Sequence, residues 1–134
     1  KEGLLKNGEK LSLGFSCLAL KSYYMTGLWE KQSTSFQNNW IEFINSFQKN
    51  HTNFPINSYV DSEYLNGFSD AGIKRQFKNT TKTLLNLTTN FDFDTNEKKK
   101  QDGVRAETKQ AISTLFQVGS KNKLAFLAGL RTTN

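Results

Sequence analysis

The apolar and polar positions of residues 35–50 follow the period of an amphipathic helix. The apolar side chains fall at helical spacing: Phe36, Trp40, Phe43, Ile44 and Phe47. The polar residues, Asn45 among them, fall on the opposite face. Ser33, Thr34 or Ser35 can act as N-cap, because their hydroxyl groups accept hydrogen bonds from the free N–H groups of a first turn. This stretch is the strongest helix prediction in the chain.

Residues 11–25 are apolar on two adjacent helical faces. One face holds Leu11, Phe15, Leu18, Ser22 and Met25, and the next holds Leu13, Cys17, Leu20 and Tyr24. A helix that is apolar around so much of its circumference is usually central in its domain. The same residues also alternate, as in a buried strand, but the pattern continues through LKSYYM and favours a helix. We expect Tyr24 and Met25 to continue the buried faces, Gly27 to end the helix, and Leu28 and Trp29 to cover the core.

The remaining segments predict further short helices. The single proline, Pro55, breaks the chain after the amphipathic helix. A short helix should follow Asp61, and a fresh one should begin near Ser69. Residues 92–103 are polar and predict an exposed loop. Residues 104–118 predict a helix that ends at Gly119 and carries an apolar stripe: Val104, Ala111, Ile112, Leu115 and Phe116. The last residues, 120–134, predict a short helix or a terminal strand.

Together these segments predict a mainly α fold. Four or five amphipathic stretches with short polar connections are typical of an antiparallel helical bundle, and some strand content is compatible with the pattern. A chain of 134 residues with 36% hydrophobic content is long enough for one core, so we expect residues 1–134 to form a single helical domain. No stretch is long and apolar enough to suggest a membrane span.

A formal net charge of +6 raises nucleic-acid binding as an alternative function. The carriers would be four cations at helical spacing: Lys74, Arg75, Lys78 and Lys82. The lysines are otherwise scattered, and only three of the eighteen basic residues are arginines, the residue best suited to phosphate and base-edge recognition. We therefore rank a basic nucleic-acid-binding domain second.

The residue types needed for catalysis are scarce. One histidine, His51, and one cysteine, Cys17, provide neither a disulfide nor a histidine-rich metal site. We interpret His51 as a polar surface residue and Cys17 as a small buried one. Glycine-rich phosphate loops are missing as well. We expect no metal and no cofactor, and an enzyme with unidentified catalytic groups ranks third.

The segment Tyr23–Gly27, followed by an aromatic-rich helix, resembles the first helix end of extracytoplasmic four-helix sensor domains, which often close with a Tyr-Leu-Leu-Thr-Gly-like sequence. The resemblance implies a non-enzymatic binding or sensing module for a small molecule or a protein partner. It also favours an extracytoplasmic or secreted location over a cytoplasmic one. Tyr23, Trp29 and Trp40 are the ligand-binding candidates, because aromatic side chains commonly line such sites.

Overall fold

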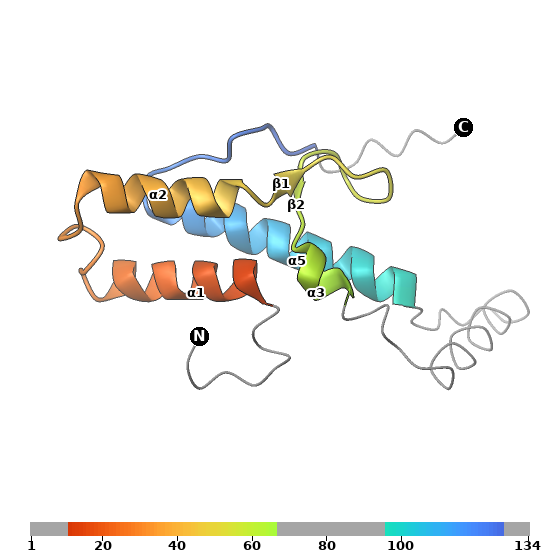
Figure 1. Ribbon diagram of the computed structural model, residues 1–134, viewed down its shortest axis with the longest axis horizontal. Helices are drawn as coiled ribbons and strands as arrows, with labels where there is room; N and C mark the ends of the chain where they lie inside the picture. The colour runs from red at the N-terminus through yellow and green to blue at the C-terminus, as the bar shows by residue number, and fades with distance from the viewer. Residues whose placement is uncertain (1–10, 67–95, 128–134) are drawn as a thin grey trace, which may run out of the picture.

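The computed structural model describes residues 11–66 and 96–127. Within these ranges the chain is mainly helical, with four helices, three of them at least seven residues long, and one small antiparallel sheet (Figure 1). The elements are α1 (Ser12–Met25), α2 (Thr34–Asn45), β1 (Gln48–Lys49), β2 (Ser58–Tyr59), α3 (Ser62–Asn66) and α5 (Asn96–Gln117). None of the helices in these ranges is both long enough and apolar enough to cross a bilayer.

Helix α1 runs antiparallel to α2 but in the same direction as α5 (Figure 1). The amide of Gln110 donates to the backbone oxygen of Gly14, and further along both helices Lys21 Nζ donates to Ser113 Oγ over 3.2 Å. The antiparallel packing expected from the sequence is therefore found between α1 and α2, whereas α1 and α5 are parallel.

The predicted N-cap of α2 and the predicted glycines at the ends of α1 and α5 are confirmed, but α2 ends at Asn45, and residues 48–49, expected in the same helix, form β1. Ser33 Oγ accepts a hydrogen bond from the backbone N–H of Phe36 and caps α2. Gly27 and Gly119 follow α1 and α5 with φ angles of 69° and 76°. That left-handed conformation is easy for glycine, and it lets the next N–H group turn back to a carbonyl of the last helical turn.

The core lies where α1, α2, β2 and α5 meet. Its buried members are Leu13, Cys17, Leu20, Trp29, Ile44, Tyr59, Ala111 and Leu115. The face of α1 that carries Leu13, Cys17 and Leu20 is thus buried as expected. Residues 12–20 are helical, which decides between the two conformations that their pattern allowed.

Three expectations at the end of α1 are wrong: Tyr24, Met25 and Leu28 are exposed, Met25 by 78%. The backbone N–H groups of Leu28 and Trp29 both bond to the carbonyl oxygen of Tyr23, so the chain folds back over Tyr23. Trp29 consequently turns into the core. Tyr24 and Met25 lie about 100° and 200° further around the helix than Tyr23, so their side chains point away from the core.

Two expectations about α5 also need correction. Residues 96–103 are not a loop, because α5 begins at Asn96. Glu, Lys and Gln are good helix formers, and ion pairs Lys100–Glu97 and Arg105–Asp102 at i,i+3 spacing add to this first part of the helix. Phe116 is 80% exposed, because it follows the buried Leu115 and lies about 100° away from the core stripe.

The expected break around Pro55 is a small hairpin in which Gln48 pairs with Tyr59 and Lys49 with Ser58. Residues 120–127 are not helical. They run back along α2 with a bend at residues 123–124 and form a bridge between Leu127 and Ile56 (Figure 1). Strand content is therefore present, although small.

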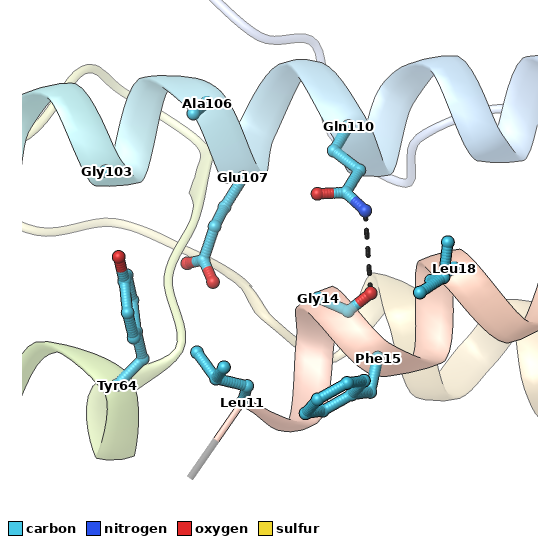
Figure 2. A pocket seen from close by; sticks show the side chains of 9 residues that line it. All are labelled: Leu11, Gly14, Phe15, Leu18, Tyr64, Gly103, Ala106, Glu107 and Gln110. Atoms are coloured by element: carbon cyan, nitrogen blue, oxygen red, sulfur yellow. Dashed lines mark hydrogen bonds between the residues drawn. The ribbon is translucent and has the colours of Figure 1, made fainter. Parts of the chain in front are cut away.

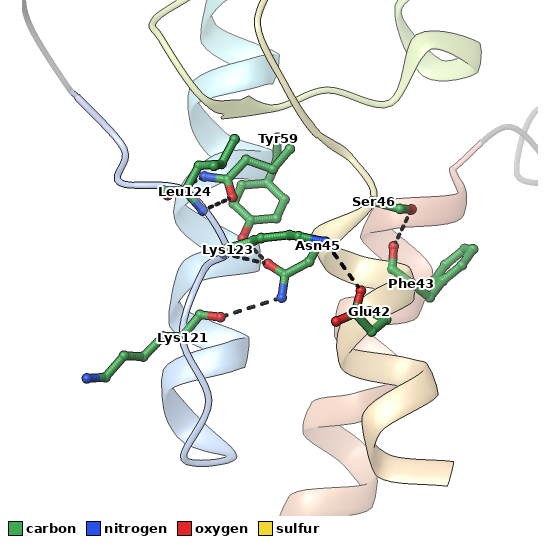
Figure 3. A network of polar contacts seen from close by, with 9 residues as sticks. Glu42, Phe43, Asn45, Ser46, Tyr59, Lys121, Lys123 and Leu124 are labelled. Carbon is green, nitrogen blue, oxygen red and sulfur yellow. Dashed lines mark hydrogen bonds and ion pairs between the residues drawn. The ribbon is translucent and has the colours of Figure 1, made fainter. Parts of the chain in front are cut away.

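Asn45 joins this returning segment to the core, which explains why a residue expected on the polar face is buried (Figure 3). Its Oδ1 accepts hydrogen bonds from the Tyr59 hydroxyl at 2.7 Å and from the backbone N–H of Lys123 at 3.2 Å. A buried amide is tolerated when such bonds replace those with water.

Candidate functional site

A cavity of about 320 Å³ lies between α1, α3 and α5 (Figure 2). Its lining combines apolar side chains, two glycines and three polar groups. The lining residues are Leu11, Gly14, Phe15, Leu18, Tyr64, Gly103, Ala106, Glu107 and Gln110.

Helix α1 supplies most of the apolar wall. Leu11, Phe15 and Leu18 belong to the helical face that the core does not use. This accounts for a helix that is apolar on two faces: one face packs in the core and the other lines the cavity. Phe15 and Leu18 remain exposed, so apolar surface is available at this cavity.

Glu107 places a carboxyl group at the cavity. The residue is only 8% exposed, and its Oε2 has no hydrogen-bond partner in the structure. The pKa of Glu107 is raised from 4.5 to about 7, mainly by burial and secondly by the nearby charge of Asp61. A hydrogen bond with the backbone of Asp61 acts in the opposite direction. The carboxyl group therefore changes its charge near neutral pH.

Tyr64 on α3 closes the cavity against Gly103 of α5. A Cβ atom at Gly103 would lie 3.4 Å from Cε1 of the Tyr64 ring, so the glycine allows close approach of α3 to α5. Burial, together with the charge of Glu107, raises the pKa of the Tyr64 hydroxyl above its ordinary value. Tyr64 therefore stays protonated at neutral pH.

Asp61 holds the two helices beside the cavity in place. Its Oδ2 accepts a hydrogen bond of 3.0 Å from the backbone N–H of Leu13, and its Oδ1 accepts one of 3.4 Å from the backbone N–H of Tyr64. Leu11, the N-cap residue of α1, makes no side-chain cap bond, so Asp61 replaces it from a distant part of the sequence. One carboxylate thereby caps both α1 and α3.

We predict that Asp61→Ala lowers the free energy of unfolding by about 2 kcal/mol, because two caps worth about 1 kcal/mol each are lost. Urea denaturation at pH 5 measures this under conditions in which Glu107 is largely protonated, so its repulsion with Asp61 does not offset the loss. Ser33→Ala, which removes one cap from α2, is the matched control and should cost about half as much. Equal losses for the two variants would contradict the double role of Asp61.

The three ligand-binding candidates from the sequence lie together but do not line this cavity. Trp40 meets Tyr23 edge to face with ring centroids 5.2 Å apart, and Trp29 likewise at 6.2 Å. Trp40 Nε1 also donates to Ser16 Oγ over 2.7 Å. Trp29 is a core residue, and Tyr23 and Trp40 pack against that core. Their assignment as ligand contacts stays a prediction.

The four candidates for nucleic-acid contact, Lys74, Arg75, Lys78 and Lys82, lie outside the described residues. Cys17 is buried as expected, and burial raises the pKa of its thiol to about 11, which makes it a poor nucleophile. His51 differs from the expected surface residue, because its ring is partly buried against Phe54. In the described part of the chain no three metal-ligating side chains gather into one group.

Sequence reasoning missed Glu107 and the cavity beside it. Glu107 lies three residues after Val104 and four before Ala111, so it falls on the same helical stripe as the buried residues of α5. An acidic residue on a buried stripe was the pattern that could have identified it. The second apolar face of α1 was the other indication.

Comparison with known proteins identifies no family for this chain. No protein-family model, no curated protein and no solved structure matches it. The case for a function therefore rests on the cavity and the residues around it.

Proposed function

We propose that this protein is a non-enzymatic helical binding module that holds a small, largely apolar molecule in the cavity between α1, α3 and α5. The observation that carries the proposal is the cavity itself. Its volume of about 320 Å³ is at the lower end of the range of ligand sites, roughly 300–1,000 Å³. An apolar lining with a few polar groups is also typical of such sites.

The exposed side chains of the cavity give a physical reason for binding. Phe15 and Leu18 are in contact with water although they are large and apolar. Removing apolar area from water contributes about 25 cal/mol per Å². A ligand that covers these two side chains therefore gains free energy without any rearrangement of the core residues on the other face of α1.

A sensing role is the form of this proposal that the sequence favours. The resemblance of Tyr23–Gly27 to extracytoplasmic four-helix sensor domains supports a bundle that reports ligand binding outside the cytoplasm. An enzyme is less well supported, because the described residues offer one carboxyl group at the cavity and no nucleophile with a base beside it.

Gly14 provides a test that leaves the core untouched. It lines the cavity, and a Cβ atom at this position would have no atom within 4 Å apart from the neighbouring residues and backbone of its own helix. We predict that Gly14→Leu fills part of the cavity and abolishes binding, whereas Gly14→Ala retains it. Both variants should fold, because leucine and alanine have higher helix propensity than glycine.

The probes are three molecules of similar size with different charge: phenethylamine, 2-phenylethanol and 3-phenylpropanoate. Saturation-transfer NMR should detect binding of at least one of them to the wild type and to Gly14→Ala, and a loss of the effect in Gly14→Leu. If none of the three binds, or if Gly14→Leu binds them as well as the wild type does, the cavity is not the ligand site.

A further inference from the structure

We propose that the ligand carries a protonated amine, which the buried carboxylate of Glu107 binds inside the cavity. This inference rests on the proposed function and adds the chemical class of the ligand. The juxtaposition that carries it is a carboxylate oxygen without a hydrogen bond beside a largely apolar cavity (Figure 2).

Glu107 is built into the site and is not a surface charge. Only 8% of the residue is exposed, and Oε2 makes no hydrogen bond in the structure. A buried charged group without a partner is costly, and a charged donor that reaches it relieves that cost. An ammonium group supplies both the donor and the opposite charge.

The carboxylate of Asp61, which lies close to Glu107, cannot bind the ammonium group of the ligand in the same way. Both oxygens of Asp61 accept backbone hydrogen bonds, one from Leu13 and the other from Tyr64. Asp61 instead adds negative charge close to Glu107. Within the cavity lining, Glu107 is the residue with a carboxylate oxygen that makes no hydrogen bond.

The negative charge of the Glu107 carboxylate disfavours an anionic ligand in the cavity. Among the described residues that line the cavity there is no lysine or arginine, so within that lining an anion would meet a carboxylate without a compensating cation. A neutral hydroxyl can donate to Oε2, but it gains no Coulomb attraction. The expected order of affinity is therefore amine, then alcohol, then carboxylate.

The pH dependence of binding follows from the ionisation of Glu107. The titratable groups that face it in the described structure are Asp61, Tyr64 on α3 and Cys17 on α1. Raised pKa values keep Tyr64 and Cys17 protonated between pH 6 and pH 8. Since the pKa of Glu107 is about 7, the affinity for an amine should rise about tenfold over this range and then level off. The affinity for an alcohol should not rise.

Phenethylamine, 2-phenylethanol and 3-phenylpropanoate test the inference at pH 8. NMR titrations should give a dissociation constant for the amine that is about tenfold to a hundredfold lower than that for the alcohol, and the carboxylate should bind weakest. Glu107→Gln keeps the size and shape of the side chain, and it should remove the preference for the amine. Glu97→Gln is the matched control, since Glu97 lies exposed on the same helix and pairs with Lys100.

The outcomes separate the two proposals. If the alcohol binds the wild type as tightly as the amine does, or if Glu107→Gln keeps the preference, the amine inference is wrong and the cavity remains a ligand site. If none of the three molecules binds, both proposals fail. The wild-type comparison at pH 6 and pH 8 needs no variant, so it holds even if Glu107→Gln does not fold; equal amine affinity at the two pH values overturns the inference.

Discussion

The free energy of unfolding should fall by about 3 kcal/mol as the pH rises from 4.5 to about 7, because burial keeps Glu107 protonated in the folded protein over that range. The unfolded chain releases the proton near pH 4.5, whereas the folded protein releases it near pH 7. Between these values the folded state binds more protons, so rising pH favours unfolding. Below the range both states are protonated and the full stability is present. Above it both states are ionised and Glu107 adds no further slope.

Urea denaturation of the wild type and Glu107→Gln at a series of pH values between 4.5 and 8 measures this contribution. The difference between the two proteins isolates Glu107 from the other carboxyl groups, because glutamine does not titrate. That difference should shift by about 3 kcal/mol against the wild type as the pH rises. Glu97→Gln should follow the wild type, since Glu97 is exposed. Parallel curves for the wild type and Glu107→Gln would show that the carboxyl group is not buried as described.

Trp40→Ala should lower the free energy of unfolding by about 3–5 kcal/mol, the usual cost of deleting a packed tryptophan ring. The Trp40 ring meets Tyr23, Trp29 and Phe36 edge to face, with centroids 5.2 to 6.2 Å apart. Its Nε1 also donates to Ser16, which joins α2 to α1. The alanine variant loses the ring contacts and leaves a void beside the core.

Two further variants decide whether Trp40 acts in packing or in binding. Trp40→Phe keeps most of the ring area and loses the bond to Ser16, so it should cost less than the alanine variant. Phe43→Ala removes an aromatic ring from the exposed side of the same helix and should change stability little. Phenethylamine should still bind Trp40→Ala at a temperature at which that variant is folded. A small loss of stability with complete loss of binding would place the ligand at the aromatic cluster predicted from the sequence.

Features set by neighbouring residues were predictable from the sequence. Ser33 caps α2, and Gly27 and Gly119 follow the ends of α1 and α5, because each depends on atoms within a few residues along the chain. The apolar period of α2 and the buried face of α1 that holds Cys17 have the same local origin. Such features follow from helix geometry and need no knowledge of the rest of the fold.

Features set by distant contacts were not predictable in this way. Asp61 caps α1 at Leu13, which lies 48 positions earlier in the sequence. Asn45 is buried only because Tyr59 and Lys123 reach its side chain. The sequence pattern marks both residues as polar and does not say which partners they meet.

The candidate site combines both kinds of feature. The two apolar faces of α1 were visible in the sequence, but their division between a core and a cavity depends on where α3 and α5 pack. Glu107 falls on the buried stripe of α5, but its ionisation depends on burial and on the proximity of Asp61. The aromatic residues attracted attention in the sequence because they are numerous, and the structure packs them against one another.

A two-dimensional ¹H–¹⁵N NMR titration with phenethylamine at pH 8 shows whether the ligand enters the cavity between α1, α3 and α5. Ligand in the cavity should shift the backbone amide signals of Gly14, Gly103 and Glu107, which come from α1 and α5, two of the three helices that line it. The indole N–H signals of Trp29 and Trp40 should move little. Shifts confined to the two indole signals, with the three amide signals unmoved, would contradict the account and place binding at the aromatic cluster.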